Sequence, residues 1–293
     1  MSARSLLFVP GDSERKLAKA EGAGADILIL DLEDSVAPSQ KAAARVRVRE
    51  YLAAHRDRSA TQLWVRINPL ETAESLQDLA TVVAAAPDGI MQPKTRSADD
   101  VTRLGHYLDA LETAYALPPG GIRILPVATE TPEALFSLGG MSRVGPRLYG
   151  VTWGAEDLSS AIGATGNKDA DGRWTTPYQL VRSLCLFAAG AARVAAVDTL
   201  YADFRDGAGL RAACSEARRD GFTGKLAIHP DQVGVINECF VPTAAEVAQA
   251  ERIVALFAAN PGVAALAFDG QMVDIPHLRQ AEKVLARAAR RQA

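Results

Sequence analysis

The sequence predicts an α/β fold, a closed (β/α)8 barrel of the TIM type with a C-terminal helical cap extension. Eight short β-rich runs alternate with longer spacers of helical pattern, which predicts a parallel sheet. A chain of 293 residues is long enough for one such barrel and an appendage. Most runs end in polar or charged side chains, and the carboxyl ends of barrel strands meet at one mouth. The predicted strands are Leu6–Pro10, Ile27–Glu33, Leu63–Asn68, Gly89–Lys94, Ile124–Glu130, Leu148–Asp157, Ala195–Tyr201 and Lys225–Pro230.

The spacers between these strands carry helix-start signals. Ser39 is suited to cap the helix after the second strand, and Ser97 precedes a helix expected over residues 98–115. Thr131, followed by Pro132, opens a helix directly after the fifth strand. The predicted order is therefore strand and helix in alternation.

The chain beyond the eighth strand is longer than one closing helix requires. We expect the catalytic barrel over residues 1–235 and a cap or oligomerisation extension over residues 236–293. Thr243 and Glu246 form a capping-box pattern at the start of the extension. Its expected elements are a helix from Thr243 to about Asn260, an extended piece over residues 263–273 and a last helix from about His277.

The bulk composition excludes several classes of partner. Lys and Arg number 32 against 35 Asp and Glu, and the resulting net charge of −3 argues against non-specific nucleic-acid binding. No apolar stretch approaches the roughly 18–20 residues that a membrane helix needs. The first eleven residues do not have the pattern of a secretory signal. Three widely spaced cysteines indicate reduced thiols, so we expect a cytoplasmic protein that binds neither nucleic acid nor membranes.

Carboxylates at two neighbouring strand ends are the candidate metal ligands. Glu130 ends the fifth predicted strand, and Glu156 and Asp157 end the sixth. Two carboxylates suit Mg²⁺, which leaves its other positions to substrate and water. The alternative is that these acids cap the starts of helices, and the residues alone leave it open.

Cations at the same mouth favour the metal interpretation. Arg66 lies at the end of the third predicted strand and Lys94 at the end of the fourth. Cations buried beside carboxylates require mutual pairing or an anionic ligand. The planar guanidinium of Arg66 suits a carboxylate or an enolate-like oxygen, although a salt bridge to Asp31 or Glu33 is the alternative.

Acids also alternate at the end of the second predicted strand. With a period of two, Asp31 and Glu33 point the same way, toward the barrel axis or the mouth. These are too many acids for one divalent ion. We therefore expect Glu33 and Asp34 to support the site by orienting water or Arg66.

A polar, glycine-containing stretch, Gly163–Thr176, follows the sixth predicted strand. It lacks the Gly-Lys-Ser/Thr ending of a phosphate loop, so a surface or specificity loop is the preferred interpretation. Trp153, shortly before the acidic pair, either shapes the wall of the pocket or packs in the core.

A set of short motifs spread over nearly the whole chain carries a family resemblance. The motifs are Leu7–Gly11, Leu30–Val36, Val65–Asn68, Pro93-Lys94, Glu130, Gly154–Asp157, Asp203-Phe204, Ala227–Pro230 and Phe268–Asp274. Together they resemble the citrate lyase β-subunit-like enzymes of the HpcH/HpaI aldolase–citrate lyase type. That superfamily includes malyl-CoA and citramalyl-CoA lyases. Any one motif alone is a weak signal, but the set is specific.

The resemblance implies a Mg²⁺-dependent barrel that cleaves or forms a carbon–carbon bond beside a thioester. Glu130 and Asp157 look like the metal ligands and bind the substrate together with Arg66, which also stabilises a thioester enolate. Asp274 resembles a tail aspartate that reaches an adjacent subunit's mouth as acid or base. A homo-oligomer, a trimer or hexamer, is therefore implied.

The expected reaction divides a 3-hydroxy acyl-CoA thioester, such as malyl-, citramalyl- or citryl-CoA, into an acyl-CoA and a 2-keto acid. Arg66, Asp274 and Glu33 are its expected catalytic residues. By resemblance, Lys19 and Arg15 on the first helix are placed like residues that contact CoA phosphates. An ordinary solvated helix face is the alternative for Lys19.

Two other functions remain open from the residues. One is a class II aldolase that releases pyruvate from a free hydroxy-keto acid and has no use for a CoA site. The other is a citrate lyase β subunit that acts only in a complex with an acyl carrier protein. Water in place of an acceptor would also turn the same machinery into a thioesterase.

Overall fold

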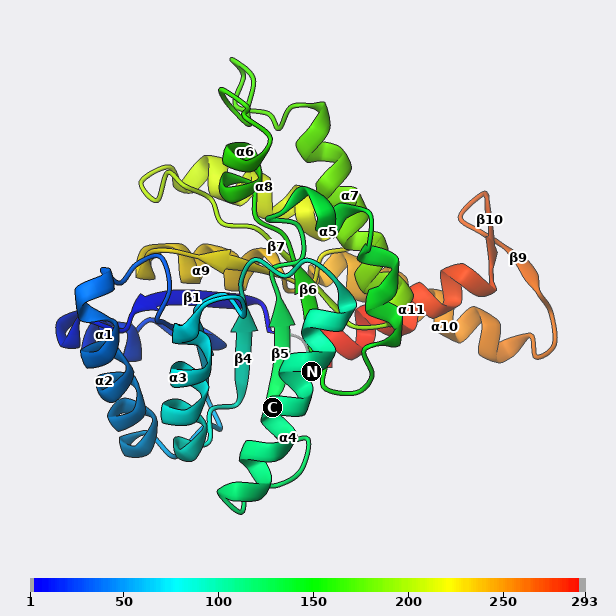
Figure 1. Cartoon of the computed structure of the whole chain (residues 1–293). Coiled ribbons are helices and arrows are strands. Elements are labelled where there is room, and N and C mark those ends of the chain that lie inside the picture. The colour runs from blue at the N-terminus through cyan, green and yellow to red at the C-terminus, as the bar shows by residue number, and fades with distance from the viewer. Residues whose placement is uncertain (1–2, 290–293) are drawn as a thin grey trace. The chain divides into compact units, whose positions relative to one another are not determined.

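A parallel barrel forms most of the chain (Figure 1). The computed structural model describes residues 3–289, and the chain divides into two compact units, residues 1–237 and 238–293. The strands of the first unit are β1 (Ser5–Pro10), β2 (Ile27–Asp31), β3 (Gln62–Arg66), β4 (Gly89–Gln92), β5 (Arg123–Pro126), β6 (Gly150–Thr152), β7 (Ala195–Asp198) and β8 (Gly224–Ala227). Its helices are α1 (Glu14–Glu21), α2 (Lys41–Ala54), α3 (Ala73–Val82), α4 (Ala98–Ala114), α5 (Pro132–Leu135), α6 (Glu156–Ala161), α7 (Thr176–Ala192) and α8 (Gly207–Asp220), with α9 (Pro230–Cys239) at the boundary.

Backbone hydrogen bonds close the sheet into a barrel. The strands pair in the order β5-β4-β3-β2-β1-β8-β7-β6. The two end strands are joined in turn, because Tyr149 N–H donates to the carbonyl of Ile124 at 2.8 Å and Ala128 N–H to that of Thr152 at 2.9 Å. The predicted (β/α)8 barrel is confirmed.

Large apolar side chains fill the interior of the barrel. Ile29, Trp64, Met91 and Leu125 belong to one buried cluster. Trp64 lies opposite Gly89 on the adjacent strand, and a Cβ at that position would lie 2.5 Å from the indole ring. Glycine is therefore required for the ring to lie across β4. Because the interior is filled, a ligand can bind only beyond the strand ends.

Several predicted strands end earlier than expected. β5 ends at Pro126, so the prediction that Glu130 ends the fifth strand is wrong, and Glu130 lies in the turn that follows. Asp31 ends β2 by accepting the N–H groups of Glu33 at 2.9 Å and Ser35 at 3.2 Å. The prediction that Glu156 and Asp157 end the sixth strand is wrong, since both lie in the first turn of α6. Carboxylates in a first turn also interact favourably with the helix dipole.

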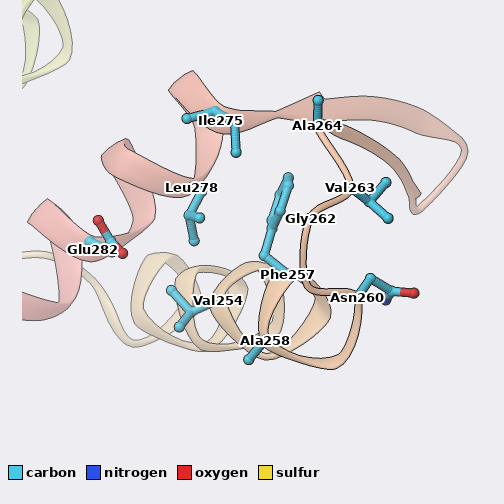
Figure 2. Close-up of a pocket in the computed structure, with 10 residues that line it drawn as sticks. All are labelled: Val254, Phe257, Ala258, Asn260, Gly262, Val263, Ala264, Ile275, Leu278 and Glu282. Atoms are coloured by element: carbon cyan, nitrogen blue, oxygen red, sulfur yellow. The ribbon is translucent and has the colours of Figure 1, made fainter.

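The second unit is a helical hairpin with a small antiparallel β-hairpin. It contains α10 (Ala244–Ala259), β9 (Ala265–Phe268), β10 (Gln271–Asp274) and α11 (Ile275–Ala288). Figure 2 shows Val254 and Phe257 of α10 and Ile275 and Leu278 of α11 around an apolar hollow, whose volume is 440 Å³. The predicted capping box of Thr243 forms. No helix within residues 3–289 combines the length and apolar character needed to cross a bilayer.

The last helix begins two residues before the predicted start. Asp274 is its N-cap, and the side chain of His277 completes a capping box with it. Pro276, in the first turn, has no N–H to leave unpaired and suits a helix start. Asp274 therefore joins the end of β10 to the start of α11.

Gly224 on β8 provides a test of the barrel closure. A Cβ there would lie 2.2 Å from the carbonyl oxygen of Ala3 and 2.8 Å from that of Arg4, both backbone atoms. We expect Gly224→Ala to lower the free energy of unfolding by about 1–3 kcal/mol, the usual cost of overpacking. Urea unfolding followed by circular dichroism measures this change.

Gly234→Ala is the matched control. Gly234 lies on α9, and no heavy atom lies within 4 Å of its ideal Cβ. Since alanine favours helix by about 1 kcal/mol over glycine, this variant should be neutral or more stable. Equal stability of the two variants would contradict the close approach of β8 and β1.

Candidate active site at the carboxyl end of the barrel

One cavity of 430 Å³ opens where the strands end, at the end of the barrel toward which the arrows of β4 and β5 point in Figure 1. Its lining contains one cation, Arg66, and five carboxylates. A second group of lining residues is apolar or aromatic. The carboxylates are Asp31, Asp34, Glu130, Glu156 and Asp157, and the apolar group includes Phe8, Met91, Val127, Trp153, Trp174, Leu200, Leu226 and Ile228. The arrangement combines an excess of negative charge with a hydrocarbon surface.

Arg66 is fixed in the cavity by two acids of β2 and the turn after it. Its Nε and Nη2 donate to the two carboxylate oxygens of Asp31, each at 2.7 Å, and its Nη1 lies 2.9 Å from Glu33 Oε2. Burial alone would lower the pKa of Arg66, but the bond to Asp31 raises it above its ordinary value. The alternative salt bridges are thus both present, and further N–H groups of the guanidinium remain for a ligand.

Lys94 ties the acids of three barrel segments together. Its Nζ lies 2.5 Å from Glu33 Oε1 and 3.2 Å from Asp157 Oδ1. Its backbone N–H donates to Glu130 Oε2 at 2.5 Å. Lys94 adopts φ +48, a left-handed conformation that non-glycine residues rarely take and that clusters at functional sites. Burial would lower its pKa, but the bond to Glu33 raises it, so the side chain stays a cation.

Glu130 is a buried carboxylate, and no cationic side chain of residues 3–289 forms a salt bridge with it. Glu130 is 6% exposed and lies in the turn after β5. Burial raises its pKa to about 8. The hydrogen bond from Lys94 N–H opposes this rise, and the charge of Asp157 adds to it. Gly154 makes room for Glu130, because a Cβ there would lie 2.9 Å from Glu130 Cγ.

The donor set of this corner fits a magnesium ion. Within residues 3–289 no three His, Cys, Asp or Glu side chains converge as metal ligands. Glu130 and Asp157 supply two carboxylates whose mutual repulsion a divalent cation would relieve. Mg²⁺ usually takes only one or two protein carboxylates and keeps water and substrate oxygens as its other ligands. A softer ion, which prefers imidazole or thiolate, would find no histidine or cysteine among the described residues of the lining.

Two indoles form a continuous part of the cavity lining. Trp153 is fully buried, and its Nε1–H donates to Asp198 Oδ1 at 2.8 Å. Trp174 meets it edge to face, with 5.1 Å between ring centroids. Trp174 comes from the predicted surface or specificity loop after α6. The sequence analysis did not single it out, and an aromatic residue in an otherwise polar loop was the available signal.

Four predicted site residues are not among the residues that line this cavity. One of them, Glu33, still contacts Arg66 and Lys94. Arg15 and Lys19 are exposed on α1, whose N-cap is Ser13. Asp274 belongs to the second unit, where its Oδ1 lies 2.6 Å from Nδ1 of His277 and its side chain is 36% exposed. The bond to His277 lowers the pKa of Asp274. Their predicted contacts with CoA and with an adjacent subunit stay predictions.

Comparisons with known proteins place the chain in a family. Residues 4–230 match the family described as HpcH/HpaI aldolase/citrate lyase, and residues 178–290 match a carbon–carbon bond lyase of the TIM-barrel fold. The chain is similar to the mitochondrial citramalyl-CoA lyase of Rattus norvegicus, at 34% identity over 97% of this chain and 86% of the relative. It is also similar to (3S)-malyl-CoA thioesterase of Cereibacter sphaeroides, at 35% identity over 97% and 94%.

A solved relative supports the same assignment. The structure of CitE from Mycobacterium tuberculosis in complex with magnesium, acetoacetate and coenzyme A matches with a TM-score of 0.81 at 34% identity, over 98% of both chains. Magnesium, the predicted cofactor, and CoA, part of the predicted substrate, are both present in that relative. The predicted family and the prediction of a carbon–carbon lyase are confirmed, whereas compartment and oligomeric state stay predictions. The chain belongs to the HpcH/HpaI aldolase/citrate lyase family.

Proposed function

We propose that this protein is a Mg²⁺-dependent lyase that cleaves or condenses a 3-hydroxy acyl-CoA thioester. Malyl-, citramalyl- and citryl-CoA are the candidate substrates, and an acyl-CoA and a 2-keto acid are the products. The observation that carries the proposal is the buried Glu130 beside Asp157 in one cavity with the fixed guanidinium of Arg66. The names of the relatives, a citramalyl-CoA lyase and a malyl-CoA thioesterase, support a thioester substrate.

Glu130 and Asp157 would hold the magnesium ion. When bound, the ion supplies Lewis-acid polarisation of the hydroxyl and carboxylate oxygens of a substrate. Lys94 positions both ligands, since its backbone N–H binds Glu130 and its Nζ binds Asp157. The backbone of Lys94 is left-handed, and this one residue contacts Glu130 with its N–H and Asp157 with its Nζ.

Arg66 would stabilise the charge that develops on the thioester oxygen. When a base takes the hydroxyl proton and the carbon–carbon bond breaks, the hydroxyl oxygen becomes the carbonyl of the keto acid, and the electrons of the broken bond pass to the acyl-CoA fragment as an enolate. Asp31 and Glu33 hold the guanidinium in place, so little reorganisation is needed as this charge appears. On this proposal Glu33 supports the site by orienting Arg66, which it contacts.

Asp274 is our candidate for the acid that protonates the enolate carbon. It lies in the second unit, and we propose that it serves the mouth of an adjacent subunit in a trimer or hexamer. Arg15 and Lys19 on α1 are the candidates for binding the CoA phosphates, because both are exposed cations on one helix. The solved relative that contains coenzyme A supports a CoA site.

A substrate panel tests the reaction. With Mg²⁺ present, we expect the purified protein to release glyoxylate, pyruvate or oxaloacetate from at least one of malyl-, citramalyl- and citryl-CoA. Trapping each keto acid as a hydrazone identifies the acyl group. Cleavage of free hydroxy-keto acids with every thioester intact would establish the aldolase instead. Activity that appears only with an acyl carrier protein would establish the citrate lyase β subunit.

Glu130→Gln tests whether protonation of the Glu130 carboxyl controls Mg²⁺ binding. Because the folded pKa is about 8 and the ordinary value is 4.5, the metal-free fold binds more protons than the unfolded chain between these pH values. The contribution of Glu130 to stability therefore falls as pH rises through this window, by up to ~1.4 kcal/mol per pH unit. Mg²⁺ requires the carboxylate, so its affinity should rise about tenfold per pH unit below pH 8 and then level off.

Calorimetry and thermal unfolding measure both effects. Glu130→Gln should lose the pH-dependent part of Mg²⁺ binding and most of the turnover. Glu133→Gln, at an exposed position in the first turn of α5, is the matched control and should behave like the wild type. Mg²⁺ affinity that does not depend on pH in the wild type would contradict the role of Glu130.

Asp274→Asn separates chemistry from helix capping. Asparagine caps a helix about as well as aspartate, so the fold of the second unit should persist. Loss of the acid should reduce kcat by about 10²–10⁴-fold with Mg²⁺ affinity unchanged. Mixing this variant with Glu130→Gln under exchange conditions should restore part of the activity if the two residues act across subunits. An unchanged kcat would exclude Asp274 as the acid.

A further inference from the structure

The two indoles of the cavity are held by different parts of the chain. Trp153 follows β6 directly and is fixed by Asp198, whose other oxygen lies 2.6 Å from the buried Nζ of Lys225. Trp174 comes from the loop before α7 and is half-buried. Trp153 therefore belongs to the barrel, whereas Trp174 belongs to a loop whose sequence can change without disturbing the sheet.

The loop is folded back on itself so that Trp174 reaches the cavity. Thr175 N–H donates to the carbonyl of Asn167 at 3.0 Å, and Lys168 pairs with Trp174 as an antiparallel bridge. The ammonium of Lys168 lies 4.7 Å from the ring centroid of Trp174 and 5.2 Å from that of Tyr201. Asn167 Nδ2 also donates to Glu156 Oε1 at 3.0 Å, which links the loop to α6.

The charges of the cavity determine what can lie against this wall. Arg66 is the one cation among the described residues of the lining, and Asp31 occupies two of its nitrogens. Lys168 lies against the rings of Trp174 and Tyr201 but is not among the residues that line the cavity. A substrate carboxylate that enters the cavity against the indoles would therefore lose its hydration without a cation in the described lining beside it, which is costly. A hydrocarbon substituent has no such cost and gains contact with the rings.

We propose that Trp174 is a specificity-determining residue that sets the size of the hydrocarbon substituent on the acyl chain. The inference rests on the proposed lyase function and deepens it. The substrate it favours is a 3-hydroxy acyl thioester whose variable group is hydrogen or a short alkyl group, and a carboxymethyl group, as in citryl-CoA, is disfavoured. Lys168 is a positioning residue, which acts by holding the ring of Trp174.

A graded series of thioesters tests this proposal. The alkyl substituent grows by one carbon from hydrogen through methyl and ethyl to propyl, and kcat/KM is measured for wild type, Trp174→Phe and Trp174→Ala. Removing the indole should move the optimum of the series to a longer group. The ratio of kcat/KM for the next longer substrate to that for the wild-type optimum should rise about 10- to 200-fold in Trp174→Ala, and less in Trp174→Phe.

Two further variants separate specificity from folding. Tyr115→Ala removes an aromatic ring at the end of α4, outside the cavity lining, and should leave the ratio unchanged. Lys168→Met should shift the ratio by about two- to fivefold in the same direction as Trp174→Ala, and Lys168→Arg should restore it. The two Lys168 variants keep the indole of Trp174, so they test the proposal even if Trp174→Ala does not fold. The inhibition constant of free CoA should not change in any variant.

The outcomes distinguish failure of the proposed role of Trp174 from failure of the proposed lyase function. If the wild type cleaves neither a member of the series nor citryl-CoA, the proposed lyase function fails. If it cleaves some, and Trp174→Ala changes kcat/KM for all of them by one factor, the lyase stands and the specificity role of Trp174 is overturned. A parallel rise in the inhibition constant of free CoA would also overturn it, because the ring would then face the CoA arm. Cleavage of citryl-CoA as the best substrate would have the same consequence.

Discussion

The excess of carboxylate over cation at the barrel mouth is the constraint on which the site depends. Buried charges are costly unless they are paired. Arg66 and Lys94 satisfy Asp31 and Glu33, the two acids closest to them. Glu130 is left with a backbone N–H alone, and its pKa rises accordingly. On the proposed function, a divalent cation held by Glu130 and Asp157 would supply the missing partner.

The barrel makes such a cluster possible because parallel strands bring distant segments to one end. The acids and cations come from the ends of β2, β3 and β4, the turn after β5 and the start of α6. Each is held by short local contacts, as Asp31 is by the N–H groups of Glu33 and Ser35. The interior below is packed around Trp64, so the charged layer rests on a solid apolar support.

Sequence reasoning located the acids because strand ends and a period of two are local patterns. Asp31 and Glu33 both contact Arg66, the salt bridges that the sequence analysis gave as an alternative, although Glu33 lies beyond the end of β2. The left-handed backbone of Lys94 and the clearance at Gly154 were not predictable, because each depends on Glu130, which lies 36 and 24 residues away in the chain. The sequence analysis placed the end of β6 too late, because this end also depends on a contact between distant segments. The bond from Gly154 N–H to Thr129, which helps turn the chain into α6, joins two loops.

On the proposed mechanism, the two units also divide the proton chemistry. The carboxylates of the barrel mouth must be ionised to bind a cation, whereas the acid that protonates the enolate must carry a proton at that moment. Carboxylates that share one site shift each other's pKa, so both states are difficult to maintain together. Asp274 lies in the second unit, where its carboxylate is bound to His277. Within the second unit the bond to His277 lowers the pKa of Asp274, so on this proposal the carboxyl takes up its proton at the neighbouring mouth, where nearby carboxylates favour the protonated form.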